Sequence, residues 1–283
     1  MPAPYNSVLT KPDNLNWCLS TVNSGNSPTN RLVFYSTLYH TLFFPLRQTK
    51  SKDVKPMRRI FLCLLCLSLV LVPVKGAEAP KYVALTFDDG PSGRFTRQLL
   101  KGLKARDVQA TFLLCGYRME QYPELVTQIF EAGHEIGCHG YSHSNMEPMS
   151  RRDIAAEIEK MHKLLPEGCE VAFLRPPGGC CSENVRQVAQ ARGLAILSWS
   201  VDPRDWATRD TWAIEKKVLA GVKDGDVILL HDMTDSSVKA ALDIVDSLKG
   251  RGFRFVTASR LAVLRGTVPR PGKTYSSFPP RDA

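Results

Sequence analysis

From Tyr82 onward, short apolar runs alternate along the chain with amphipathic segments. The apolar runs are rich in β-branched and aromatic residues and lack polar alternation, which is typical of strands buried on both faces of a sheet. They predict strands at residues 82–87, 110–114, 135–138, 173–174, 194–201, 227–230 and 254–256. Between them, apolar residues recur at helical spacing, with capping residues, glycines or prolines at the ends. These segments predict helices bounded by residues 95–106, 123–133, 150–166, 182–193, 212–222 and 238–248.

A strand followed by a helix, repeated about seven times, predicts an α/β fold with a parallel sheet. Closure of the sheet into a (β/α) barrel is favoured over an open sheet, although periodicity alone does not separate the two. In barrels the catalytic groups gather at the carboxyl ends of the strands. Clusters of polar residues follow several of the predicted strands in this chain, which is the first indication of a site.

The segment before Tyr82 reads as a leader. Met57, Arg58 and Arg59 precede an apolar run at residues 60–74, and small residues follow it. A basic start, an apolar stretch of about 15 residues and a small-residue end match a secretory signal peptide. The run is shorter than the roughly 20 apolar residues that a membrane span needs. A cleaved signal is therefore favoured, and an uncleaved signal anchor is the alternative and the only expected membrane contact.

This leader sets the expected domain organisation. Because signal peptides act at the N-terminus, the simplest interpretation is that translation starts at Met57. Residues 1–56 would then be a disordered upstream segment or a start-site artefact. We expect a signal peptide or signal anchor at 57–77, a catalytic domain at 78–265 and a C-terminal tail at 266–283. The protein would be secreted or associated with the cell envelope.

The net charge of +9 would by itself suggest nucleic acid or an anionic surface as a partner. Residues 1–77 hold nine Lys and Arg against two acidic residues, so the leader contributes +7 and residues 78–283 only +2. The basic excess belongs to the leader, and no nucleic-acid partner is expected for the folded part.

The first chemical cluster closes the first predicted strand. Asp88 and Asp89 are adjacent carboxylates, followed by Gly90 and Pro91. Consecutive residues of a strand point to opposite faces, so both carboxylates reach one pocket only where the strand opens into a loop, as Gly-Pro favours. Taken alone, the run is equally compatible with a solvated turn, since Asp-Gly is a common turn dipeptide.

Two further clusters follow later strands. His139 and His143 stand four residues apart among residues typical of a loop, and two imidazoles at this spacing can bind one cation, though the spacing also arises by chance. With one Asp they provide three ligands and leave positions open for water and substrate, as in a catalytic metal site.

The third cluster begins at Arg175, which precedes a Pro-Pro-Gly-Gly run. Arg175 can orient a carboxylate, while the backbone at Gly178 lets N–H groups approach a reacting oxygen; a plain loop with a surface Arg is the alternative.

The last two clusters also lie at predicted strand ends. Asp205 and Trp206 belong to one, and Leu229 and His231 to the other. A His beside acids suits general acid catalysis, because a neighbouring carboxylate raises its pKa toward neutral pH. A structural His and a core Trp are the alternatives.

Five motifs in order carry a resemblance to a known family. Thr-Phe-Asp-Asp-Gly-Pro, His-x-x-x-His, Arg-Pro-Pro-Gly, Asp-Trp and Leu-x-His resemble the motifs of the polysaccharide deacetylases of carbohydrate esterase family 4, the NodB-homology domain. The resemblance spans residues 80–260. Each motif alone is weak evidence for the family, but all five in this order identify it specifically. The resemblance implies a distorted (β/α) barrel of about seven parallel strands.

The resemblance also assigns roles around a metal. Asp89, His139 and His143 would hold a divalent ion, usually Zn2+, with Co2+, Ni2+ or Mn2+ as alternatives. Asp88 would be the general base, and Arg175 would orient it.

On the other side of the site, the resemblance implies that Asp205 tunes His231, the general acid. Trp206 and Leu229 would form an apolar slot for the acetyl methyl group, and a backbone N–H near Gly178 would stabilise the oxyanion. The family often has a Tyr where Gly178 stands, so an aromatic contact to the sugar is missing there while the backbone N–H remains.

The expected activity is metal-dependent removal of N-acetyl groups from N-acetylglucosamine-type residues of a cell-envelope polysaccharide. Peptidoglycan is the first choice, because export and the small charge of the folded part suit such a polymer. A chitooligosaccharide deacetylase or an O-acetyl xylan esterase is the alternative. A glycosidase would need two carboxylates flanking the glycosidic bond, which the Asp pair beside His ligands does not suggest. A binding module without catalysis would lack one of the roles, and here each role has a residue.

Overall fold

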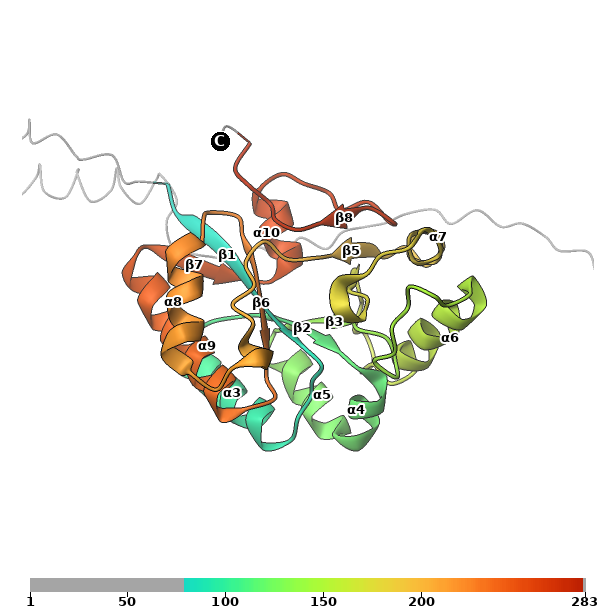
Figure 1. Cartoon of the computed structure of the whole chain (residues 1–283), viewed down its shortest axis with the longest axis horizontal. Coiled ribbons are helices and arrows are strands. Elements are labelled where there is room, and N and C mark those ends of the chain that lie inside the picture. Colours follow the sequence, from blue (N-terminus) through green and yellow to red (C-terminus); the bar gives the residue numbers. More distant parts are fainter. Residues whose placement is uncertain (1–78, 282–283) are drawn as a thin grey trace, which may run out of the picture. The chain divides into compact units, whose positions relative to one another are not determined.

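The buried apolar runs form one parallel sheet in the computed structural model, which describes residues 79–281 (Figure 1). The strands are β1 (Lys81–Asp88), β2 (Thr111–Leu114), β3 (Glu135–Cys138), β4 (Phe173–Leu174), β5 (Ala195–Leu197), β6 (Val227–His231), β7 (Phe253–Val256) and β8 (Thr274–Tyr275). They lie in the order β6-β1-β2-β3-β4-β5-β8, and β7 pairs with the first half of β1. The predicted segment 1–56 and signal at 57–77 lie outside the described residues.

The sheet curls back on itself. Val201, just beyond β5, forms a parallel bridge with Ile228 of β6, so the chain after β5 returns to the strand at the other side of the sheet. Every pairing between the strands is parallel. This arrangement confirms the predicted distorted barrel of parallel strands.

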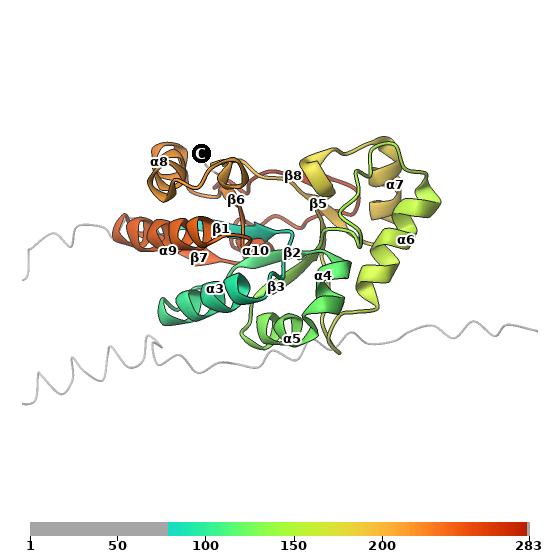
Figure 2. The ribbon, with the colours of Figure 1, turned by 60° about the horizontal axis from the view of Figure 1, so that its bottom comes forward.

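Helices cover the outside of the curled sheet (Figure 2). They are α3 (Arg94–Ala105), α4 (Gly116–Gln121), α5 (Pro123–Glu131), α6 (Arg151–His162), α7 (Glu183–Ala191), α8 (Thr211–Gly221) and α9 (Asp235–Gly250). The remaining helix, α10 (Ala258–Leu264), packs instead against the inside of the curl. The start of α6 follows the predicted cap, because the Ser150 side chain accepts a hydrogen bond from the backbone N–H of Asp153. Among the described residues, none of these helices has the length and apolar content needed to cross a bilayer.

Strand alternation divides the buried residues into an outer and an inner core. In β1, Val83, Leu85 and Phe87 pack with the helices, whereas Ala84 belongs to a second cluster inside the curl. The inner cluster includes residues of α10 and Phe278. Apolar side chains from the C-terminal part of the chain therefore fill the interior of the barrel, and the polar residues of the inner face lie nearer the carboxyl ends of the strands.

The structure extends the elements predicted from the sequence. The helices α4 and α10 and the strand β8 were not predicted, and the strand expected at 194–201 is confined to Ala195–Leu197. The segment beyond residue 265, expected as a tail, pairs through β8 with β5 and buries Phe278. A Cβ at Gly225 would collide with the Phe278 carbonyl, so glycine lets this segment pass close to the chain before β6.

Candidate active site at the carboxyl ends of the strands

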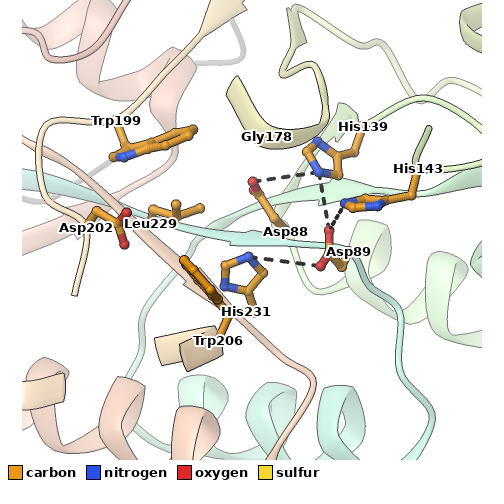
Figure 3. Close-up of a pocket in the computed structure, with 10 residues that line it drawn as sticks. All are labelled: Asp88, Asp89, His139, His143, Gly178, Trp199, Asp202, Trp206, Leu229 and His231. Atoms are coloured by element: carbon orange, nitrogen blue, oxygen red, sulfur yellow. Dashed lines mark ion pairs between the residues drawn. The ribbon is translucent and has the colours of Figure 1, made fainter. Parts of the chain in front are cut away.

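A cavity of about 460 Å³ opens at the carboxyl ends of the strands (Figure 3). Its lining residues are Asp88, Asp89, His139, His143, Gly178, Trp199, Asp202, Trp206, Leu229 and His231. Eight of the ten residues predicted from the sequence are in this set. The other two, Arg175 and Asp205, are fully buried behind it and contact Asp88 and His231. The structure thus brings all the predicted site residues together.

Strand alternation explains why residues distant in sequence face one cavity. Ala84 of β1, Phe173 of β4 and Val227 of β6 belong to the inner core. Counting in steps of two along each strand places Asp88, Arg175 and His231 on the same inner face.

Asp89 follows Asp88 directly and would point outward if β1 continued. Its φ of 71° takes the backbone into the left-handed region and ends the alternation, so both carboxylates reach the cavity. The next residue must be small, because a Cβ on Gly90 would lie 2.7 Å from a carboxylate oxygen of the buried Asp232. The predicted opening of the strand into a loop is present.

Asp89, His139 and His143 each offer one potential metal-ligating atom, and the three atoms converge. Asp89 Oδ1 lies 3.3 Å from His139 Nε2 and 3.0 Å from His143 Nε2. Ligand atoms of the three residues all lie within 4.8 Å of one another. Burial raises the pKa of Asp89, but hydrogen bonds and positive charge from protonated His139 and His143 hold that pKa well below its usual range. A cation in place of those protons favours the ionised carboxylate in the same way.

The proton positions around Asp89 fit a divalent cation. His139 Nδ1 lies 2.6 Å from the carbonyl oxygen of Arg175, which can only accept, so this nitrogen carries the proton. In the neutral ring, the lone pair of Nε2 then faces Asp89. Asp89 Oδ1 is buried and accepts no hydrogen bond from the described residues. A carboxylate and an imidazole lone pair facing each other without a proton donor are stabilised by a cation between them.

Asp88 is held from behind by Arg175. The guanidinium donates from Nη1 to Asp88 Oδ1 at 2.6 Å and to the hydroxyl of Thr86 at 2.9 Å. Its Nε and Nη2 donate to the carbonyls of Leu197 and Ser198, so the fully buried Arg has partners on each side of its fork. The other oxygen, Asp88 Oδ2, lies 3.9 Å from His139 Nε2 and faces the cluster of ligating atoms.

His231 and the fully buried Asp205 form a second pair on the opposite flank. Asp205 Oδ1 lies 2.8 Å from His231 Nδ1, and Asp205 Oδ2 accepts the backbone N–H of His231 at 2.9 Å. Burial lowers the pKa of His231, but the hydrogen bond and charge of Asp205 raise it to about 9. His231 Nε2 lies 4.0 Å from Asp89 Oδ2, so a protonated ring would present its proton toward the cavity.

Apolar surface completes the cavity beside His231. Leu229 is almost fully buried, whereas Trp206 is 54% exposed at the rim. Gly178 has a φ of 70°, and a Cβ there would meet nothing within 4 Å. This position therefore leaves open space above the cavity.

Two lining residues, Trp199 and Asp202, were not among the predicted site residues. The strand predicted at 194–201 placed Trp199 within a continuous buried run, but β5 ends at Leu197 and the chain then turns into the site. Serines on both sides of Trp199 are the sequence signal for this exposure. Asp202 stands within the cluster that contains Asp205, and its position there is the corresponding signal.

Comparisons with known proteins agree with this geometry. The family model described as polysaccharide deacetylase matches residues 75–197. A peptidoglycan-N-acetylglucosamine deacetylase of Listeria monocytogenes is 38% identical over 197 residues, covering 69% of this chain and 42% of the relative, so this chain spans less than half of that protein. A peptidoglycan-N-acetylglucosamine deacetylase of Bacillus cereus is 37% identical over 187 residues, covering 64% of this chain and 88% of the relative. The structure of a family 4 acetyl xylan esterase from Clostridium thermocellum in complex with a cobalt ion superposes with a TM-score of 0.65 at 33% identity, covering 70% of this chain and 100% of the esterase.

Proposed function

This chain belongs to the polysaccharide deacetylase family, and we propose that it is a metal-dependent hydrolase that removes N-acetyl groups from N-acetylglucosamine-type residues of peptidoglycan. The observation that carries the proposal is the convergence of Asp89, His139 and His143 between two ion pairs, Asp88 with Arg175 and His231 with Asp205. The names of the Listeria and Bacillus relatives support peptidoglycan as the substrate. The leader at 57–77 supports a place in the cell envelope or outside the cell.

Asp89, His139 and His143 would hold the divalent ion, which we propose to be Zn2+, with Co2+, Ni2+ or Mn2+ as alternatives. Two His and one Asp are a ligand set that leaves positions open, as catalytic sites require. When bound, the ion polarises the acetyl carbonyl and acidifies the attacking water. Cobalt in the Clostridium structure is consistent with a site that accepts more than one such ion.

In our proposal Asp88 accepts a proton from the attacking water at Oδ2. Arg175 holds Oδ1, so the carboxylate is fixed in direction while its second oxygen remains available. The backbone N–H at Gly178 would donate to the oxygen of the acetyl group as negative charge develops there.

His231 would donate its Nε2 proton to the sugar nitrogen as the C–N bond breaks, which releases acetate and the free amine. Asp205 stabilises the imidazolium before this transfer and fixes the ring through Nδ1. Leu229 and Trp206 would enclose the acetyl methyl group in an apolar slot that excludes water. Asp88 and His231 thus take opposite proton roles from opposite flanks.

The decisive experiment incubates the purified protein with peptidoglycan, chitooligosaccharides and acetylated xylan, and follows acetate release and product mass. We expect release from peptidoglycan that a chelator abolishes and added Zn2+ or Co2+ restores. Asp88→Asn should bind metal as the wild type does and lose turnover by about 10²-fold or more. Absence of chelator-sensitive acetate release from all three substrates would refute the hydrolase proposal.

The second candidate function is an O-acetyl xylan esterase, favoured by the resemblance to the Clostridium esterase. The same assay separates the two. Acetate release from xylan with no free amine formed on peptidoglycan would establish the esterase in place of the N-deacetylase.

A further inference from the structure

The loop that carries His139 and His143 is hydrogen-bonded to the start of α4 on one side and to α6 on the other. Its two central carbonyls are held on the α4 side: the backbone N–H of Gly116 donates to Gly140 O, and that of Tyr117 donates to Tyr141 O, both at 3.0 Å. The start of α4 therefore fixes the loop through its carbonyl groups. The N–H groups of the loop face α6.

One carboxylate oxygen of Glu157, on α6, binds the opposite side of the loop. Glu157 Oε2 accepts the backbone N–H of Tyr141 at 2.9 Å, the backbone N–H of Ser142 at 2.7 Å and the Ser142 hydroxyl at 2.9 Å. Two successive N–H groups directed at one anion form a nest, and a charged acceptor makes such hydrogen bonds stronger than neutral ones. Glu157 does not line the cavity, so its role is not to contact a substrate there.

The held segment leads directly into a strained residue. His143 has a φ of 60°, in the left-handed region that a residue with a Cβ rarely adopts. The loop forms neither helix nor strand between Gly140 and Ser150, so no regular hydrogen-bonding pattern maintains that conformation. The hydrogen bonds that Glu157 accepts from the N–H groups of Tyr141 and Ser142 fix the backbone immediately before His143.

His139 does not need this support. It follows β3, its backbone N–H donates to Leu114 O at 3.0 Å, and its ring is held by Arg175 O. The two imidazoles therefore differ in what positions them, and only His143 depends on the loop.

We propose that Glu157 is a positioning residue for the metal site, which holds the loop so that His143 Nε2 stays directed at Asp89 before any ion binds. The inference rests on the proposed function, because it takes Asp89, His139 and His143 as the metal ligands. Its effect is on metal affinity, since a loop that is already ordered loses less conformational entropy when the ion binds.

The test measures metal affinity of the full-length protein after metal removal, by competition between the protein and a chromophoric chelator for Zn2+ and for Co2+. Glu157→Ala removes all three bonds, and we expect the dissociation constant to rise by about 10-fold or more. Glu157→Gln keeps an oxygen that can accept the same bonds and should lose much less affinity. Glu159→Ala is the matched control, because Glu159 lies on the same helix and its ion pairs within residues 79–281 are with the surface residues Lys163 and Arg192.

The Co2+ absorption spectrum gives a readout that folding alone does not move. In Glu157→Ala we expect a weaker or shifted spectrum, because His143 is less fixed as a ligand, while Glu159→Ala keeps the wild-type spectrum. Circular dichroism of each metal-free variant checks its fold. If Glu157→Ala does not fold, Glu157→Asp takes its place, because its shorter side chain keeps the charge but draws the carboxylate back from the two N–H groups.

Two outcomes would overturn the inference. Wild-type metal affinity in a folded Glu157→Ala or Glu157→Asp variant would show that the loop needs no such support. Equal losses in Glu157→Gln and Glu157→Ala would assign the effect to charge rather than to hydrogen bonds. In either case, a wild-type protein that binds metal and releases acetate leaves the proposed function intact. A wild-type protein that binds neither Zn2+ nor Co2+ would refute both the role of Glu157 and the proposed function.

Discussion

Two histidines face Asp89 from opposite flanks, and the groups behind them differ. His139, after β3, has its Nδ1 against a backbone carbonyl of Arg175, 2.6 Å away. His231, at the end of β6, has its Nδ1 against the carboxylate of Asp205, 2.8 Å away. Both rings are fixed in orientation, and both present Nε2 to the cavity.

The difference between these partners teaches how one residue type serves two chemical purposes. A carbonyl is a neutral acceptor, so it orders the His139 ring while leaving the Nε2 lone pair available to a cation. A carboxylate adds a full negative charge, and this charge raises the pKa of His231 to about 9 against the effect of burial. The first flank is suited to ligation and the second to proton donation.

The largest effect is expected from removing the ligating flank. His139→Ala should abolish tight Zn2+ binding and lower acetate release by at least about 10³-fold, because a catalytic metal supplies several kcal/mol of transition-state stabilisation. Metal content of the purified variant and its turnover measure the two effects. Retention of one metal per chain with full turnover would contradict the assignment of this flank.

A smaller effect is expected on the opposite flank. His231→Ala should lower turnover by about 10²-fold, the typical contribution of a general acid, while metal affinity stays close to that of the wild type. Metal titration and steady-state kinetics on the same preparation test the contrast. If His231→Ala loses the metal as His139→Ala does, the two flanks are not distinct.

The finest distinction is the pH dependence. His231 must be protonated to act as an acid, so activity falls as pH rises through its pKa. Asp205→Asn removes the charge that raises this pKa, and the alkaline limb of the kcat/KM profile should move to lower pH by about one unit or more. The profile is measured with a chitooligosaccharide substrate at constant ionic strength. An unmoved limb would show that another group controls it.

The sequence predicted the arrangement of the fold best where local and tertiary preferences agree. The strand β3 and the helix α6 follow their apolar patterns and, for α6, the Ser150 cap. By contrast, α4 is six residues long and begins at Gly116, where a Cβ would meet the Tyr141 ring. That helix depends on the loop it packs against, and a local pattern does not contain such information.

Most residues of the candidate site were predictable from the sequence, but their geometry was not. Polar residues at successive strand ends mark Asp88, Arg175 and His231 from the sequence alone, because parallel strands bring those ends together. The left-handed backbone of Asp89 and the interruption after β5 that exposes Trp199 arise from tertiary contacts. Gly90 and Pro91 indicate a loop after Asp89, and serines flank Trp199, but neither signal predicts the backbone conformation that directs these side chains into the cavity.

The pairing of β8 with β5 has a consequence for how the chain is made. The β5 edge donates from Ile196 and Ser198 to the carbonyls of Lys273 and Tyr275, both at 2.8 Å, and these acceptors are synthesised after the other strands of the described sheet. Until they emerge, the growing chain presents an open strand edge that another chain can join. The interior also lacks Phe278, and such a loss costs about 3–5 kcal/mol of the about 5–15 kcal/mol that stabilises a typical domain. A chain that lacks this segment is therefore prone to aggregate, and chaperones and proteases would act on it before the folded protein is complete.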